Sequence, residues 1–74
     1  MIVEDAMRNE TMSMIQDAVR HARTKHPKLG YHWPILNEEI GEIAKAENEC
    51  DSEGWPKEVI DSIAVLVRMF EGDE

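Results

Sequence analysis

Apolar side chains recur at helical spacing in three stretches of the chain, which proline and glycine residues separate. When residues 4–25 are turned through about 100° per residue, their apolar side chains fall on one side and their charged side chains on the other. Pro27 ends this stretch, whereas Pro34 and Pro56 each suit the first turn of a new helix. No stretch shows the alternation of a β-strand. The pattern predicts an all-α fold with helices over about residues 4–25, 35–49 and 56–71.

The 74 residues suffice for one small domain, residues 1–74, which can bury only a modest core. The single cysteine, Cys50, excludes an internal disulfide, and no clustered Cys/His pattern would hold a structural zinc. Apolar residues also fill more than half the circumference of the third predicted helix, which is typical of a mostly buried helix. Self-association would cover this surface and stabilise the domain, so we expect it.

Acidic residues are concentrated in the second half of the chain. Residues 38–74 hold twelve Asp/Glu against three Lys/Arg, whereas residues 1–37 hold four against five. Such a surface repels a nucleic-acid backbone. The sequence shows neither a signal peptide nor an apolar run near the roughly 18 residues of a membrane span. We therefore expect a cytoplasmic protein that binds no nucleic-acid polymer and no membrane. Solvated acids that aid solubility are expected at Glu47, Asp51, Glu53, Asp73 and Glu74.

Two pairs of carboxylates, each spaced three residues apart, stand on the second and third predicted helices. Glu39 and Glu42 form one pair, and Glu58 and Asp61 form the other, so each pair lies on one side of its helix. Fifteen residues separate Glu42 from Glu58, which is enough for the two helices to pack antiparallel and bring the acids together. Carboxylates that close raise each other's pKa unless they share a cation. Oxygen ligands alone favour Mg²⁺ or Mn²⁺ over zinc.

Glu39 and Asp61 are the most unusual of the four acids, because both fall among apolar side chains on their helices. A charged carboxylate in such a position costs several kcal/mol without a partner, in a domain whose total stability is on the order of 5 kcal/mol. Taken singly, each acid has an ordinary explanation; Glu58, for instance, gains from the dipole at a helix start. Taken together, with only Arg68 as a nearby countercharge, they favour a metal site.

The motif EExxE at residues 38–42, followed by ExxD at residues 58–61, resembles the MazG-like all-α nucleoside triphosphate pyrophosphohydrolases, and the basic segment from Arg20 to Trp33 resembles their small phage-type members. The resemblance covers residues 35–70, roughly half of the chain. It implies hydrolysis of a nucleoside or deoxynucleoside triphosphate to the monophosphate and pyrophosphate. It also implies a helical bundle that is completed in a homodimer or homotetramer, where a partner subunit supplies a wall of the pocket.

Carried over by position, the resemblance assigns roles to five acids. Glu39, Glu42, Glu58 and Asp61 would hold Mg²⁺, with Mn²⁺ as a substitute. Glu38 and Glu39 would be the catalytic residues, with Glu38 acting as an outer ligand or orienting the attacking water. The metal would reverse the field of the acidic cleft and stabilise charge that develops on the phosphoryl oxygens.

Three further residues are candidates for substrate binding. Arg68 would be a functional cation or a salt-bridge partner of the nearby acids, and Trp33 would stack on a base or pack beside a helix start. Lys45 would contact the substrate or pair with Glu42. The basic segment of residues 20–28 would meet the triphosphate or form a solvated helix end.

Two other functions are compatible with the sequence. One is a noncatalytic MazG-like module that oligomerises and binds metal or nucleotide weakly. The other is an acidic helical surface that mimics nucleic acid. Mimicry requires the acids to lie along an exposed face, so the positions of Glu39 and Asp61 among apolar residues disfavour it.

Overall fold

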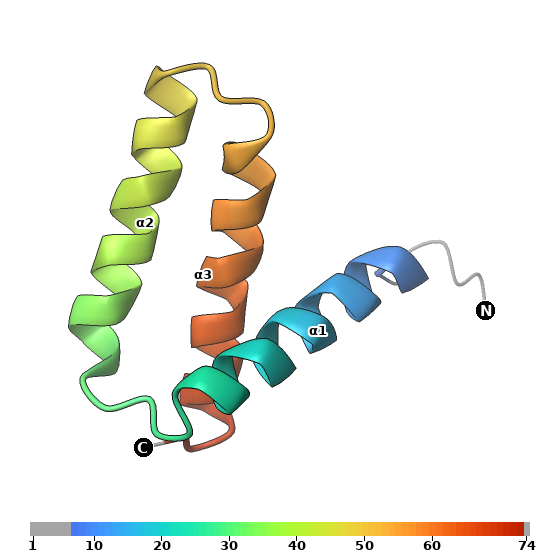
Figure 1. Cartoon of the computed structure of the whole chain (residues 1–74), viewed down its shortest axis with the longest axis vertical. Helices are drawn as coiled ribbons and strands as arrows, with labels where there is room; N and C mark the ends of the chain where they lie inside the picture. Colours follow the sequence, from blue (N-terminus) through green and yellow to red (C-terminus); the bar gives the residue numbers. More distant parts are fainter. Residues whose placement is uncertain (1–6, 74) are drawn as a thin grey trace.

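The computed structural model of the chain describes residues 7–73, which form three α-helices joined by short loops (Figure 1). Helix α1 spans Asn9–Lys25, α2 spans His32–Asn48 and α3 spans Gly54–Phe70. No strand occurs in this described part of the chain. The prediction of an all-α fold with three helices is confirmed.

The helix boundaries differ from the predicted ones at their N-terminal ends. Helix α1 begins at Asn9 rather than near residue 4; Met7 is 52% exposed, so burial does not stabilise an additional turn, and residues 4–6 lie outside the described residues. Helices α2 and α3 begin before the predicted residues 35 and 56, and Pro34 and Pro56 each occupy the third helical position. Proline is tolerated there because the first four N–H groups of a helix have no partner within it.

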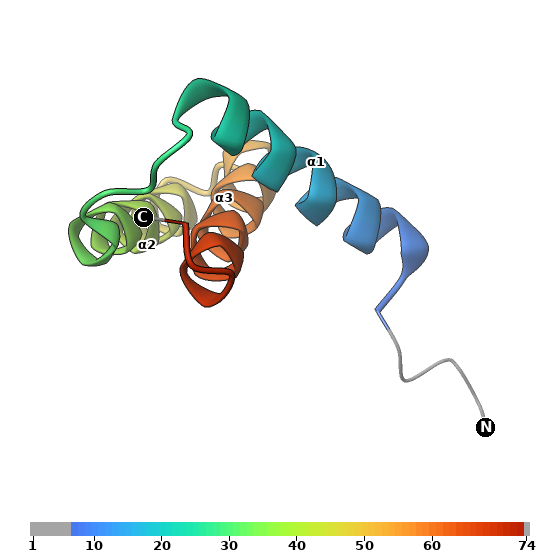
Figure 2. The same cartoon turned by 90° about the horizontal axis from the view of Figure 1, so that it is seen from below.

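Helices α2 and α3 pack side by side in opposite directions, and a tight turn joins them (Figures 1 and 2). The N–H of Asp51 donates to the carbonyl oxygen of Ala46 at 2.9 Å, and the N–H of Cys50 donates to that of Glu47 at 3.1 Å. These two bonds form a Schellman motif, and Cys50 takes the left-handed position, with φ at 54°, that glycine usually fills. Cys50 therefore has a conformational role that its sequence context did not indicate.

Asp51 connects this turn to the start of α3. Its Oδ1 accepts hydrogen bonds from the backbone N–H of Glu53 at 3.2 Å and of Gly54 at 2.8 Å. A Cβ at Gly54 would overlap the Asp51 carboxylate, so any other residue there would displace that carboxylate from these two donors. Asp51 is exposed, as expected of a solvated acid, but its carboxylate also satisfies backbone donors and fixes where α3 begins.

Helix α1 packs across the C-terminal end of α3 and not against α2, and its N-terminal half extends away from the α2–α3 pair (Figure 2). The central cluster is small and consists of Leu29, Leu36 and Val65, with Ile35 and Met69 packed against it. The radius of gyration is 13.4 Å, against about 11 Å for a compact domain of this length. The described part of the chain is thus an open arrangement, and none of its helices is long and apolar enough to cross a membrane.

Candidate metal centre

The antiparallel packing of α2 and α3 brings three predicted acids together. Glu39 from α2 and Glu58 and Asp61 from α3 each offer a carboxylate oxygen, and these oxygens all lie within 4.8 Å of one another. All three side chains are partly buried. We call these three residues the acid cluster. Glu42 lies one turn further along α2, where its carboxylate interacts with that of Glu58, because the later residue of one helix faces the earlier residue of its antiparallel neighbour.

Two carboxyl groups of the acid cluster, Glu39 and Glu58, have raised pKa values. Burial is the largest cause that raises the pKa of Glu39, followed by the charges of Glu42 and Asp61. The pKa of Glu58 is raised to about 7, first by a hydrogen bond with Glu42, then by burial and by the charges of Glu42 and Glu39. Among the described residues, Lys57 supplies a positive charge beside the acid cluster. Its Nζ lies 3.0 Å from Oδ2 of Asp61, one helical turn away. The expectation that Arg68 would be the only countercharge was wrong.

Two carboxylate oxygens of the acid cluster lack a hydrogen-bond donor within the described part of the chain. Oε2 of Glu39 and Oε2 of Glu58 are buried and have no hydrogen-bond partner among the described residues. An unsatisfied buried polar atom costs about 1–3 kcal/mol, and more when it is charged. A divalent cation held between these carboxylates would supply the missing partner, and an all-oxygen ligand set suits Mg²⁺. The residues present therefore fit the metal that the sequence predicts.

A cleft of about 390 Å³ lies beside the acid cluster and is bounded by all three helices. Its acidic wall consists of Glu38, Glu39 and Asp61. Its basic end, formed by the C-terminal halves of α1 and α3 and the loop after α1, is lined by His21, His26, Lys28 and Arg68. Small and apolar side chains, Ala64 and Val65 among them, lie between the two. The cleft thus places acids and cations from different helices around one space.

The predicted substrate-binding residues do not share one site. Only Arg68 lines the cleft. Lys45 is exposed and borders a separate hollow of about 290 Å³ that it shares with Glu42 and Glu58. Trp33 is 62% exposed in the first turn of α2, and its ring tilts against that of His32 at a centroid separation of 6.1 Å. Neither Trp33 nor Lys45 lines the cleft in this arrangement.

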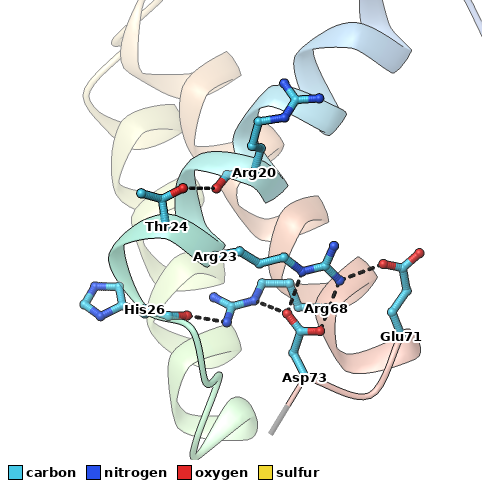
Figure 3. Close-up of polar contacts among 7 residues, drawn as sticks. All are labelled: Arg20, Arg23, Thr24, His26, Arg68, Glu71 and Asp73. Atoms are coloured by element: carbon cyan, nitrogen blue, oxygen red, sulfur yellow. Dashed lines mark hydrogen bonds and ion pairs between the residues drawn. The ribbon is translucent and has the colours of Figure 1, made fainter.

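The predicted salt bridge between Arg68 and the nearby acids Glu58 or Asp61 does not form among the described residues. The Nε of Arg68 donates to Oδ2 of Asp73 at 2.8 Å, and its Nη2 donates to the backbone carbonyl of His26 (Figure 3). These bonds link the end of α3 to the loop after α1 and to the turn after α3. Arg68 is therefore held by groups at the basic end of the cleft and not by the acidic wall.

The sequence predicts a solvated acid at Asp73, but its carboxylate is a shared ion-pair partner of Arg23 and Arg68. Arg23 also contacts its carboxylate, with Nε at 2.8 Å and Nη2 at 3.0 Å, and Arg23 contacts Glu71 at 2.6 Å (Figure 3). Hydrogen bonds from Arg23 and Arg68 lower the pKa of Asp73 to about 2. Gly72 could have indicated the position of Asp73 from sequence, since a helix that ends in glycine often turns the following residue back against its last turn.

Comparisons with known proteins identified no relative of this chain. No family model, no curated protein and no solved structure matches the chain. The resemblance to MazG-like enzymes therefore depends on the two motifs, and the geometry of the acid cluster and cleft is the structural support that a functional proposal can use.

Proposed function

We propose that this chain is a Mg²⁺-dependent pyrophosphohydrolase of the MazG-like type, which converts a nucleoside or deoxynucleoside triphosphate to the monophosphate and pyrophosphate. The observation that carries the proposal is the acid cluster with its two unpartnered buried oxygens, next to a cleft of about 390 Å³. That volume lies within the range of small-molecule sites. A triphosphate is strongly anionic, so the acidic wall would repel it unless a divalent cation lay between them.

In the proposed reaction, Glu39, Glu58 and Asp61 would hold the cation, and Glu42 would support Glu58 from the next turn of α2. When bound, Mg²⁺ polarises the phosphoryl oxygens and stabilises the charge that develops on them. Glu38 lines the cleft with a solvent-exposed carboxylate, so it can accept a proton from an attacking water. The water oxygen bonds to the α-phosphorus, the bond to the α–β bridging oxygen breaks, and pyrophosphate leaves.

The Glu39→Gln and Asp61→Asn variants are expected to lose pyrophosphate release by more than the roughly 10–100-fold that removal of an outer partner of a metal ligand costs. Each change removes a charged ligand and keeps the side-chain shape. The measurement is pyrophosphate release from a panel of ribo- and deoxyribonucleoside triphosphates with Mg²⁺.

Glu47→Gln is the matched control, because Glu47 is an exposed glutamate on the same helix and lies outside the acid cluster. It should retain the wild-type rate. Equally low pyrophosphate release by the wild type and by both folded variants would contradict the proposed enzymatic function.

We also propose that a second copy of the chain covers its apolar surface, as a homodimer or homotetramer. Phe70 is 91% exposed at the end of α3, and Leu66, one turn earlier, and Ile40 on α2 are also exposed. The expected mass in solution is at least twice the 8.5 kDa of one chain, measured by light scattering. Leu66→Asp should lower that mass, because a buried charge opposes association. A wild-type protein that stays monomeric across the concentration range would contradict this proposal.

The alternative function is a noncatalytic module that oligomerises and binds metal or nucleotide weakly. The exposed apolar residues on α2 and α3 favour it, since they suit an interaction surface without requiring chemistry. Mg²⁺ binding and self-association without turnover of any triphosphate would support this alternative.

A further inference from the structure

Arg68 combines deep burial with an unused hydrogen-bond donor. The residue is 3% exposed, yet it lines the cleft beside the acid cluster. Its Nε and Nη2 donate to Asp73 and to the His26 carbonyl (Figure 3). Nη1 makes no hydrogen bond within residues 7–73, and it is not one of the buried unpartnered atoms there, so it is accessible to solvent. A guanidinium carries five N–H donors in a planar fork that matches carboxylate and phosphate oxygens. An anion that enters the cleft would satisfy the donor that the protein leaves open.

The charges around Arg68 also favour an anion. Arg23 and Arg68 share the carboxylate of Asp73, and Arg23 also pairs with Glu71, so these two guanidinium groups face two carboxylates. Glu71 contacts Arg23 and is exposed. Lys28 lines the same end of the cleft and makes no hydrogen bond through its side chain within the described residues. Among the described lysine and arginine side chains that line the basic end, Lys28 is therefore the one whose charge is not matched by an ion pair.

The basic end and the acidic wall are separated by a distance that suits an extended phosphate chain. Arg68 lies seven residues beyond Asp61 on α3, which is about 10 Å along the helix axis at 1.5 Å per residue. Helical side chains lean toward the N-terminus of their helix, so an unrestrained Arg68 would lean over the small side chain of Ala64 toward Asp61. Asp73 and the His26 carbonyl instead hold the guanidinium at the opposite end.

We propose that Arg68 binds the terminal phosphate groups of a di- or triphosphate ligand, and that Asp73 is the positioning residue that holds Arg68 away from the acid cluster. The inference rests on the proposed function for the metal at the acidic wall, but the contact between phosphate and Arg68 requires no metal. Without Asp73, Arg68 turns toward the carboxylates and is lost to the ligand.

The test is a calorimetric titration of the full chain with inorganic pyrophosphate in EDTA at low salt. Wild-type protein binds, and Arg68→Lys and Asp73→Asn each weaken binding by about tenfold or more, since the first removes the planar fork and the second removes the charge that positions it. Arg8→Gln is the matched control: Arg8 is an exposed arginine that precedes α1, lies outside the basic segment of residues 20–28 and does not line the cleft. It changes the affinity by less than about twofold.

Circular dichroism at the titration temperature establishes that each variant is folded. If Arg68→Lys or Asp73→Asn does not fold, Lys28→Gln tests the same end through an exposed side chain and weakens pyrophosphate binding in its place. Failure of the wild type to bind pyrophosphate in EDTA overturns the inference, as does wild-type affinity in folded Asp73→Asn, which would make Asp73 purely structural. Pyrophosphate binding without triphosphate turnover would support the anion site and contradict the proposed enzymatic function.

Discussion

The Arg68→Ala variant is expected to lower the free energy of unfolding by about 3 kcal/mol, more than half of the roughly 5 kcal/mol available to a domain of this size. Arg68 is buried and donates two hydrogen bonds, one to the Asp73 carboxylate and one to the His26 carbonyl. Hydrogen bonds that involve a charged group contribute about 1.5–3 kcal/mol each, and the aliphatic stem of the side chain adds packing. The change removes the link between α3 and the loop that carries the chain from α1 to α2.

Glu71→Ala is the control for this effect. Glu71 contacts Arg23 at 2.6 Å, but both side chains are substantially exposed, so its removal should cost less than about 1 kcal/mol. Urea unfolding followed by circular dichroism measures both variants, with equal slopes required for the comparison. Equal destabilisation by the two changes would contradict a special role for the buried arginine.

Much of the acid cluster could be predicted because its geometry follows from local rules. Residues three apart share a helix face, and a short turn forces the next helix to return antiparallel, so Glu39 had to face Glu58 and Asp61 once both helices formed. The identity of the countercharge could not be predicted in the same way. Lys57 is one turn from Asp61 and reaches it, whereas Arg68 finds acceptors elsewhere.

The network around Asp73 could not be predicted from sequence, because its partners come from distant parts of the chain. Arg23 stands 50 residues away, and only the crossing of α1 over the end of α3 brings it close. The local part was accessible: the N–H of Gly72 donates to the carbonyl of Met69 and that of Asp73 to the carbonyl of Arg68, the Schellman pattern that a glycine after a helix indicates. Tertiary packing turned an apparently solvated acid into a shared ion-pair partner.

In EDTA, raising the pH from about 5 to about 8 is expected to reduce the free energy of unfolding by roughly 1–2 kcal/mol, a value discounted for partial exposure of Glu58. The pKa of Glu58 is raised from its ordinary 4.5 to about 7, first by the hydrogen bond with Glu42 and then by burial. A raised carboxyl pKa means that the folded state holds the proton more tightly. The resulting stability is complete below pH 4.5 and is lost as the pH rises through about 7.

The ion pairs of Asp73 do not contribute to this change. Hydrogen bonds from Arg23 and Arg68 lower the pKa of Asp73 from 3.8 to about 2. A lowered pKa gives stability that is present above 3.8 and lost only as the pH falls through about 2, so it is constant between pH 5 and pH 8. The change expected between pH 5 and pH 8 is therefore assigned to the raised pKa of Glu58.

Mg²⁺ is expected to restore the free energy of unfolding that is lost at pH 8, because a cation that binds only the folded state stabilises that state. At pH 8 the wild type should gain stability with added Mg²⁺, whereas Glu58→Gln should be more stable than wild type in EDTA and gain little from the ion. Removing a like charge relieves the repulsion that Glu39 and Glu42 impose, and it also removes a ligand. Thermal unfolding at both pH values, with and without Mg²⁺, measures all four conditions. A Mg²⁺ response that is the same in Glu58→Gln as in the wild type would place the ion elsewhere and remove the acid cluster as the metal centre.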